Sequence, residues 1–450
     1  MSLRRLMILA FIICLFTSCT APPNNSNTAV STATPVAKTT PAAATEKTSV
    51  QVTLPLLDAL LTDDQFVAQL RQTLKLSEDQ IEKLKRASSA EIDRLREVNA
   101  EEVDGNATDA RTRASEQLRT ILGEQKANEL TALANEYWSK GGPAEAANGK
   151  ATEMLKGPNA VPTDTRVVVN IPAFRMDLFQ DGSLVKSYKI GIGYPEFPLP
   201  LGLRKAQSII FNPTWTPPDS PWVAKMKNVT PGETVAAGDK DNPLGPIKIP
   251  IGLPSLIHGG KSPARIGKFA SHGCVGLTNA QVKDFALLLA KAANNEDISN
   301  QSITSYLEDK EKTKTVKLNE TVPVELRYET IVVEDGKLYI YKDVYAQDTN
   351  TEENLRQVLE AHSLKFEDLS EQQRTEITNA LNAMSTNPTA IPTPSPDASP
   401  AKKNAKTKKP AKPQNEVVID LGSAVAQKGY PAPVNLDDGS GKKLATDKRR

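Results

Sequence analysis

One short stretch of the sequence concentrates the residue types that can carry out covalent chemistry. Between residues 257 and 279 it contains Cys274 and two of the chain's three histidines, His258 and His272. A thiol with an ordinary pKa is mostly protonated near neutral pH, so a cysteine nucleophile needs an imidazole that accepts its proton or stabilises the thiolate. The stretch therefore indicates a cysteine nucleophile assisted by a histidine.

The use of cysteine along the chain singles out the same thiol. Two of the three cysteines, Cys14 and Cys19, lie in an N-terminal segment that reads as an export signal. Its apolar run, residues 6–16, is too short to span a bilayer comfortably. The mature fold then has a single thiol, Cys274, which excludes an intramolecular disulfide and leaves intermolecular pairing or a reactive thiol.

The end of the export signal resembles a bacterial lipobox. The residues Phe16-Thr17-Ser18-Cys19 would place a lipid on Cys19, which becomes the new N-terminus after cleavage. Phe16 replaces the usual leucine, so an ordinary cleaved signal with an incidental cysteine is the alternative. We expect an exported protein of the cell envelope or periplasm, anchored to a membrane through Cys19.

Two predicted elements position the reactive residues. His258 ends a strand predicted over residues 255–258, and Cys274 lies in the loop before a helix predicted from Asn279 to about residue 292. Asn279 can cap this helix. A loop just before a helix also offers backbone N–H groups that could bind an oxyanion.

Gly259 and Gly273 fit the same interpretation, because a backbone that passes close to a substrate or takes a positive φ favours glycine. A zinc site is one alternative, but the C-x-x-C and H-x₃-H spacings typical of zinc ligands are absent from the sequence. A buried structural Cys–His pair is the other. We expect neither a metal nor a cofactor.

The rest of the 450-residue chain divides into segments of different composition, which predicts two folded units joined by linkers. The expected fold class is multidomain α+β, with a small helical bundle followed by a mostly β, barrel-like or sandwich-like domain. The expected segments are a lipoprotein-type signal peptide at 1–19, a disordered Ala/Thr/Pro linker at 20–53, the helical bundle at 54–141, a second linker at 142–164, the β domain at 165–328 with a polar insertion at about 294–314, a hairpin and helical extension at 329–384, and a mostly disordered Pro/Ala/Lys-rich tail at 385–450.

Local signals mark several turns and helix starts. Thr62 and Ser77, each followed three residues later by glutamine, are predicted helix caps. Asp-Gly pairs at 181–182 and 335–336 predict two hairpins. Residues 322–328 return to a strand pattern and are expected to close the sheet. The formal net charge of +1 gives no reason to expect nucleic acid as a partner.

The reactive stretch is similar to the signature of the YkuD-type L,D-transpeptidase family, a histidine followed after a gap by Ser/Thr-His-Gly-Cys. Here the two parts are Ile257-His258-Gly259-Gly260 and Ser271-His272-Gly273-Cys274. The resemblance covers roughly residues 165–328. Further landmarks of the periplasmic branch of the family lie at Ile190-Gly191-Ile192-Gly193, Pro200-Leu201-Gly202, Asn212-Pro213-Thr214-Trp215 and Leu244-Gly245.

The resemblance implies a role for each residue of the signature. Cys274 would be the nucleophile and His258 its general base, with the imidazole oriented by the backbone carbonyl of Gly259. His272 would shape the pocket beside Ser271. The N–H groups of Gly273 and Cys274 would help to bind the oxyanion.

The resemblance also implies peptidoglycan as the partner. A tetrapeptide stem would acylate the cysteine at the carbonyl of its diamino acid, the terminal D-alanine would leave, and an amine would take the acyl group. A hydrolase that uses the same acyl-enzyme, such as an L,D-carboxypeptidase, is one alternative. A non-catalytic peptidoglycan-binding lipoprotein is the other.

Two positions depart from the family pattern. Members often carry arginine two residues after the catalytic cysteine, where this chain has Gly276, and many carry threonine where it has Leu199. Loss of the arginine removes a guanidinium that could hold a carboxylate or the loop. Arg265 or Lys268 could replace that charge, or both could be ordinary solvated loop residues.

Aromatic residues near the signature have two interpretations. Trp215 and Trp222 could wall a groove for a sugar or a peptide, or they could pack their loop onto the domain. The remaining histidine, His362, lies in a predicted C-terminal helix, where we expect it to be exposed.

Overall fold

The computed structural model describes residues 52–97, 107–139, 153–218, 223, 226–252, 254–385, 415–422 and 429–441. The predicted signal peptide, Cys19 and almost all of the first linker lie outside these residues. Among the described helices, none is long and apolar enough to cross a membrane.

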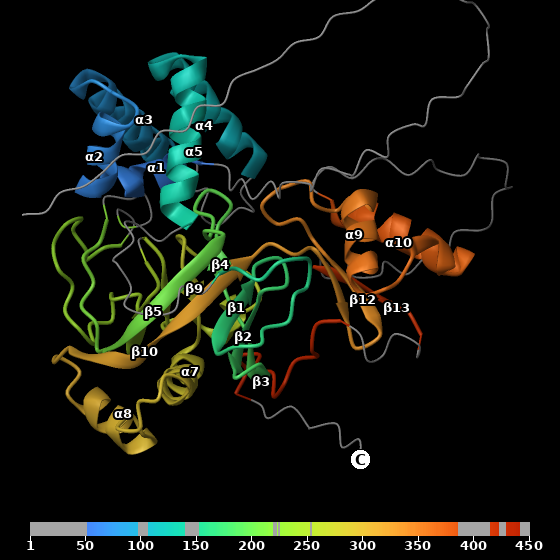
Figure 1. The fold of residues 1–450 in the computed structure, drawn as a ribbon. Helices are drawn as coiled ribbons and strands as arrows, with labels where there is room; N and C mark the ends of the chain where they lie inside the picture. The colour runs from blue at the N-terminus through green and yellow to red at the C-terminus, as the bar shows by residue number, and fades with distance from the viewer. Residues whose placement is uncertain are drawn as a thin grey trace, which may run out of the picture. The chain divides into compact units, whose positions relative to one another are not determined.

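The N-terminal region is helical, as expected (Figure 1). Apolar residues at helical spacing, among them Phe66 and Leu70, are fully buried within it. The rings of Phe66 and Tyr137 lie 5.1 Å apart, and the Tyr137 hydroxyl donates a hydrogen bond to Asp63. Its helices are α1 (Leu54–Leu61), α2 (Asp64–Gln72), α3 (Glu78–Glu97), α4 (Ala107–Leu122) and α5 (Glu124–Ser139).

One of the two predicted helix caps in this region is correct. Ser77 and Gln80 hydrogen-bond each other's backbone N–H groups at the start of α3. At α2 the cap is Asp63, whose carboxylate accepts a hydrogen bond from the N–H of Gln65. The prediction of Thr62 was wrong, because its hydroxyl donates to Ala59 at the end of α1.

The β domain is built on an eight-stranded sheet with the strand order β3-β2-β1-β10-β5-β6-β7-β9. A parallel pair, β4 and β8, forms a separate two-stranded sheet. The strands are β1 (Arg166–Asn170), β2 (Arg175–Gln180), β3 (Ser183–Lys189), β4 (Ile192–Gly193), β5 (Gly202–Phe211), β6 (Ile247–Pro250), β7 (Leu256–His258), β8 (Phe269–Ser271), β9 (Val275–Gly276) and β10 (Lys314–Arg327).

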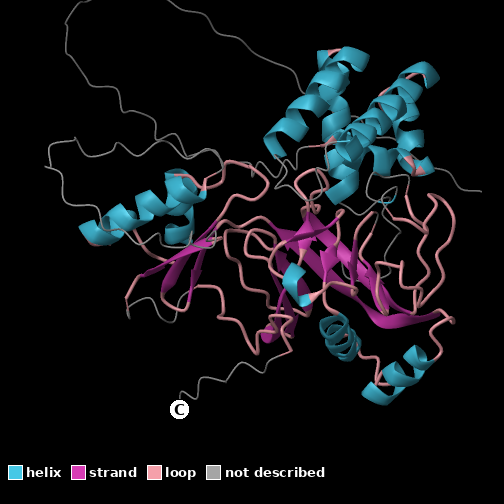
Figure 2. Cartoon of the chain, turned by 180° about the vertical axis from the view of Figure 1, so that it is seen from behind, coloured by secondary structure: helices cyan, strands magenta, loops and turns pink. Residues whose placement is uncertain are grey.

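The sheet confirms the mostly β character and corrects one strand. Strand β10 lies inside the sheet, parallel to β1 and antiparallel to β5, so it joins the two halves instead of closing an edge. The first predicted hairpin is confirmed, because β2 pairs with β3 and both Asp181 and Gly182 have positive φ. Figure 2 shows the sheet from behind, with helices outside it.

Two helices pack on this domain after the reactive stretch. They are α7 (Asn279–Ala292) and α8 (Asn300–Glu308), and a short 3₁₀ turn, η1 (Pro263–Arg265), precedes them. Helix α8 occupies the predicted polar insertion. The amide of Asn212 donates to the backbone carbonyls of Tyr306 and Asp309, and Ile303 is buried, so this segment is packed onto the sheet.

The C-terminal extension contains a second, three-stranded sheet with the order β11-β12-β13. Its hairpin turns at Asp335-Gly336, where both residues have positive φ, as predicted. The elements are β11 (Ile331–Glu334), β12 (Lys337–Tyr341), α9 (Glu352–Ala361), η2 (Phe366–Asp368), α10 (Glu371–Met384) and β13 (Glu416–Asp420). Apolar residues of α9 and α10 share one buried cluster with this sheet.

Part of the segment predicted as a mostly disordered tail, 385–450, is built into the fold as strand β13. It pairs along its length with β12, and Ile419 is buried in the cluster under α9 and α10. Residues 429–441 are also placed. The carbonyl of Asp437 accepts hydrogen bonds from the N–H of Lys189 in β3 and from the side chain of Gln281 in α7.

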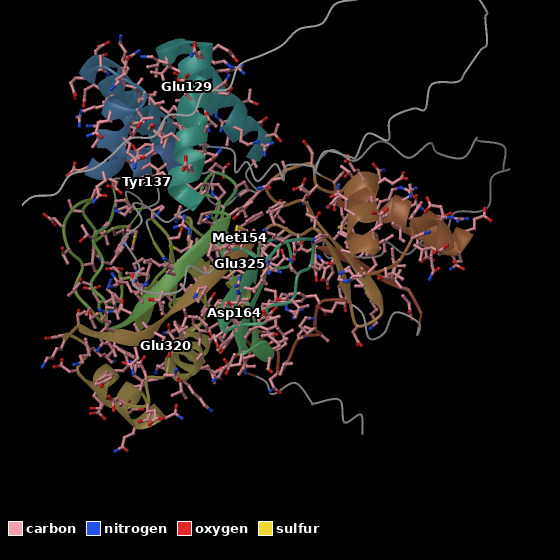
Figure 3. The ribbon with its side chains drawn as sticks, in the orientation of Figure 1. Glu129, Tyr137, Met154, Asp164, Glu320 and Glu325 are labelled. Carbon is pink, nitrogen blue, oxygen red and sulfur yellow. The ribbon has the colours of Figure 1, made fainter. Side chains whose placement is uncertain are left out.

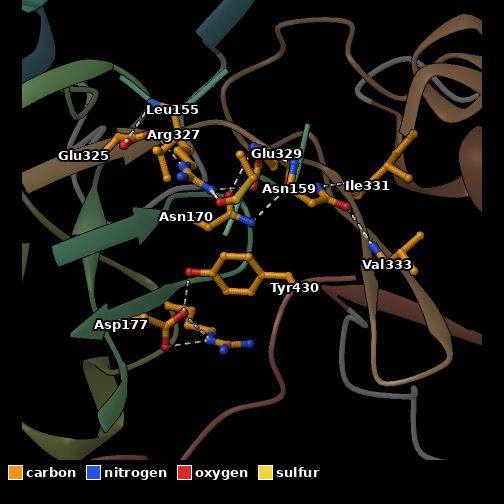
Figure 4. A network of polar contacts seen from close by, with 12 residues as sticks. Leu155, Asn159, Asn170, Asp177, Glu325, Arg327, Glu329, Ile331, Val333 and Tyr430 are labelled. Carbon is orange, nitrogen blue, oxygen red and sulfur yellow. Dashed lines mark hydrogen bonds and ion pairs between the residues drawn. The ribbon is translucent and has the colours of Figure 1, made fainter. Parts of the chain in front are cut away.

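The second predicted linker, 142–164, is likewise partly built into the fold. The side chain of Asn159 donates to the carbonyl of Ile331 and accepts from the N–H of Val333 (Figure 4). Arg166, at the start of β1, pairs with both Asp164 and Glu325, and the last two are labelled in Figure 3. These polar contacts replace apolar burial, which is why composition alone suggested a linker.

Candidate active site

The residue proposed as the base, His258, ends β7, and the proposed nucleophile, Cys274, lies in the bend just before β9. Strand β7 pairs in parallel with β9, so that Ile257 lies opposite Val275 and His258 opposite Gly276. Ile257 and Val275 are fully buried in the core. Because side chains alternate along a strand, His258 and position 276 lie on the opposite face of the sheet, and Cys274 immediately precedes β9.

The His258 side chain is buried and held by the backbone. Its Nδ1 lies 2.8 Å from the carbonyl oxygen of Gly259. A carbonyl can only accept, so Nδ1 carries the proton and Nε2 is left as the acceptor of the neutral ring. The contact expected between Gly259 and His258 is therefore present.

Burial has a large effect on the basicity of this imidazole. It lowers the pKa of His258 to about 3, and the nearby positive charge of Lys261 acts in the same direction. The ring is therefore neutral near pH 7.

Cys274 is half-buried. Burial raises the pKa of its thiol, while a hydrogen bond with the backbone of Leu256 and the charge of Lys261 oppose that rise. Burial thus favours the neutral forms of both the thiol and the His258 imidazole.

The turn before Cys274 is fixed by Ser271. Its hydroxyl accepts a hydrogen bond from the Cys274 N–H at 3.1 Å and donates one to the Cys274 carbonyl. This corrects one expectation, because the Cys274 N–H points to Ser271 and does not face a substrate oxyanion. Gly273 has φ +88°, a conformation that favours glycine, and its N–H remains the candidate donor.

His272 packs against a loop from another part of the domain. Its ring lies 4.8 Å from that of Phe197 and 5.3 Å from that of Tyr194, measured between centroids. The same loop is held by Tyr345, whose hydroxyl donates to the carbonyl of Gly193 and accepts from the N–H of Leu199. His272 therefore lies in an aromatic wall, consistent with a role in shaping the pocket.

Helix α7 holds the other side of the site. Its cap is Thr278, in a capping box with Gln281, so the prediction that Asn279 caps the helix was wrong. The Asn279 side chain instead accepts a hydrogen bond from the N–H of Gly260 at 2.8 Å. It thereby fixes the turn that follows His258.

The positive charge nearest the reactive pair comes from Lys261. Arg265 and Lys268, proposed from the sequence, have exposed side chains. Lys261 is partly buried, and its charge acts on both His258 and Cys274. Sequence reasoning missed it, because a lysine three residues after a histidine carries no signal of its own.

The aromatic groove is not supported by Trp215. Its side chain is buried in a small cluster with Val223 and Leu244, so it packs its loop onto the domain. Trp222 lies outside the described residues.

His362 is half-buried at the end of α9, with Nε2 3.3 Å from the amide oxygen of Asn159, so the expectation of an exposed side chain was wrong. Within the described part of the chain, no group of three or more His, Cys, Asp or Glu side chains could hold a metal ion.

Comparison with protein families agrees with this site. Residues 164–316 match the YkuD model, described as the L,D-transpeptidase catalytic domain, so the chain contains a domain of this family. The match covers the reactive stretch and most of the eight-stranded sheet. No curated protein matches the chain.

Three solved structures of L,D-transpeptidases are similar to this region. The catalytic domain from E. faecium is 15% identical and aligns over 37% of this chain and 100% of its own, with a TM-score of 0.24. An Enterococcus faecium L,D-transpeptidase mutant is 17% identical over 36% of this chain and 50% of its own, with a TM-score of 0.22. The Mycobacterium smegmatis enzyme is 14% identical over 36% and 58%, with a TM-score of 0.21. This chain thus spans about half the length of the longer relatives.

Proposed function

We propose that this protein is a cysteine-dependent L,D-transpeptidase that acts on peptidoglycan stem peptides. The observation that carries the proposal is that His258 ends β7 and that Cys274 immediately precedes β9, the strand paired with β7. The family match to residues 164–316 supplies the reaction class. Transfer of an acyl group through a thioester requires these two groups side by side.

The proposed first step uses the neutral pair directly. The Cys274 sulfur attacks the carbonyl of the diamino acid in the donor stem, and its proton passes to Nε2 of His258. Collapse of the tetrahedral intermediate breaks the peptide bond, and the same proton leaves with the amine of D-alanine. The product is a thioester on Cys274.

In the second step an amine of a second stem attacks the thioester. His258 accepts a proton from this amine and returns it to the sulfur, which restores the thiol. If water takes the place of the amine, the outcome is hydrolysis of the same acyl-enzyme. Analysis of the muropeptide products distinguishes a cross-link from a trimmed stem.

The proposed location follows from the N-terminal sequence. Export and a lipid on Cys19 would hold the enzyme at a membrane of the cell envelope, within reach of peptidoglycan. A fatty-acyl mass on the mature N-terminus tests this anchor. A mature N-terminus that lacks both Cys19 and lipid would contradict it.

Covalent labelling tests the enzymatic proposal. Carbapenems acylate the catalytic cysteine of YkuD-type L,D-transpeptidases, which this chain resembles. The folded protein should therefore gain the mass of one carbapenem, and the peptide that contains Cys274 should carry it. The Cys274→Ala variant should remain unmodified. A folded native chain that stays unlabelled would contradict the proposal.

A further inference from the structure

Gly276 and Lys261 lie together on the face of the sheet that carries His258. Gly276 is opposite His258 in the register of β7 and β9 and is two residues from Cys274. A Cβ atom built on Gly276 would lie 2.9 Å from Cγ and 3.0 Å from Cε of Lys261. The lysine side chain therefore runs across the glycine, in the space that a side chain at position 276 would need.

The backbone fixes the lysine in this place. The N–H of Lys261 donates to the carbonyl of Leu277 at 3.1 Å, and the N–H of Leu277 donates to the carbonyl of His258 at 2.8 Å. Lys261 is thus held beside β9 by hydrogen bonds that continue the pairing of the two strands. The stem of its side chain lies over Gly276.

Charged residues near Cys274 and His258 come from the loop after β7, from η1 and from β6. Lys261 is the charge that acts on Cys274, and burial together with the neighbouring Arg265 of η1 lowers the pKa of Lys261. Lys248 of β6 acts on His258. Arg265 is exposed, and the Lys248 ammonium lies 3.4 Å from the carbonyl of Thr214.

We propose that Lys261 is a positioning residue of the active site, whose ammonium stabilises the thiolate form of Cys274 from the space left open by Gly276. The proposal rests on the proposed function and deepens it, since negative charge develops on the Cys274 sulfur both as its proton passes to His258 and as the thioester breaks. It also gives Gly276 a physical role. The missing side chain lets the cation reach the thiol from a neighbouring loop.

Removal of the charge should change the titration of the thiol. A cation beside a thiolate lowers the pKa of the thiol, so Lys261→Met should raise the pKa of Cys274. We expect a rise of roughly 0.5–1 unit, which is a three- to tenfold slower alkylation below that pKa. Lys261→Arg should keep most of the native rate, because it keeps the charge.

A second variant tests the role of the glycine. Gly276→Ala places a methyl group against the middle of the Lys261 side chain. The lysine must then move, so alkylation should slow in the same direction but by a smaller factor. In the double variant Lys261→Met/Gly276→Ala, the alanine should add little, because the charge is already gone.

The measurement is the rate of alkylation of Cys274 by iodoacetamide between about pH 5 and 10, in the full chain, read by mass spectrometry on the peptide that contains Cys274. The reagent is neutral and needs no peptidoglycan activity, so this test is independent of the labelling by carbapenem. Lys268→Met, an exposed lysine of the same loop, should match the native profile. Thermal unfolding of each variant checks that it folds.

Two results would overturn the proposal. One is an unchanged pH profile in folded Lys261→Met, which would mean that the ammonium does not act on the thiol. The other is an equal shift in Lys261→Arg, which would mean that shape and not charge matters. A shifted profile without carbapenem labelling would keep the role of Lys261 and reject the proposed enzyme.

Discussion

Two groups of buried charges in this protein are arranged in opposite ways. One is the polar network that joins β1, β2 and β10 to the C-terminal extension (Figure 4), where guanidinium groups face carboxylates. The other is the face of β7 and β9, where the charged group beside the thiol and the imidazole is a cation, Lys261. Paired charges hold the fold together, whereas the charge of Lys261 changes how its neighbours titrate.

The network shows what pairing does. Arg175 contacts Asp177 and Glu334 and also donates to the carbonyl of Pro431. Burial opposes the charge of Arg175, yet the two carboxylates outweigh that effect and raise its pKa. At the active site the backbone hydrogen bonds of His258 with Gly259 and Leu244 oppose burial only in part, and the pKa of His258 stays low.

The largest expected effect separates chemistry from stability. Cys274→Ala should abolish the carbapenem adduct and the release of D-alanine, because it removes the nucleophile. Its free energy of unfolding should change by less than about 1 kcal/mol, since the side chain is small and half-buried. Intact mass and urea unfolding measure the two effects. A substantial loss of stability would mean that the thiol also supports the fold.

A substitution in the network of paired charges should lower the stability of the fold and leave the reactivity of Cys274 unchanged. Arg175→Met leaves two buried carboxylates without their partner, and we expect it to lower the free energy of unfolding by about 3–5 kcal/mol. Alkylation of Cys274 in the folded variant should keep its native pH profile. Lys337→Met, on the exposed side of β12, serves as the control and should be nearly neutral. A shifted thiol profile in Arg175→Met would break the distinction between the two regions.

The buried, neutral imidazole of His258 should make the free energy of unfolding fall in acid. The pKa of His258 falls from 6.5 to about 3 on folding, so the unfolded chain binds the proton first. The stability associated with the neutral ring is complete above pH 6.5 and is lost as the pH falls toward 3. By this linkage, His258→Asn should reduce the loss of stability between pH 7 and pH 4 by about 3 kcal/mol. Urea unfolding at the two pH values measures it, and an equal loss in both proteins would contradict a neutral buried ring.

A smaller effect is expected at the loop that packs on His272. Tyr345→Phe removes the hydroxyl that bonds Gly193 and Leu199. We expect a loss of about 1–2 kcal/mol, because buried backbone groups lose their partner, and slower labelling of Cys274 if the loop moves. Tyr339→Phe, in β12, is the matched control. Unfolding in urea and the rate of carbapenem labelling are the measurements, and an effect no larger than that of the control would show that the hydroxyl does not hold the loop.

The sequence predicted those parts of the fold that depend on neighbouring residues. The Asp-Gly turns at 181–182 and 335–336 were correct, because turn chemistry is set within a few residues. The capping box at Ser77 was correct for the same reason. The pairing of β13 with β12 was missed, since it joins segments far apart in the chain and the surrounding composition resembles a linker.

The active site shows the same limit. Residue types and spacing identified Cys274 and His258, because reactive side chains are rare in this sequence. The role of Lys261 was hidden, since it depends on the β7–β9 register and on the missing side chain of Gly276. The engagement of the Cys274 N–H by Ser271 is equally a matter of turn geometry, which no motif records.

The most direct test of the central claim uses a tetrapeptide stem as the donor. Incubated with the native chain near pH 7, it should release D-alanine and add the mass of the remaining stem to the peptide that contains Cys274. Cys274→Ala should show neither. A native chain that is folded, releases no D-alanine and carries no adduct would contradict acyl transfer through Cys274.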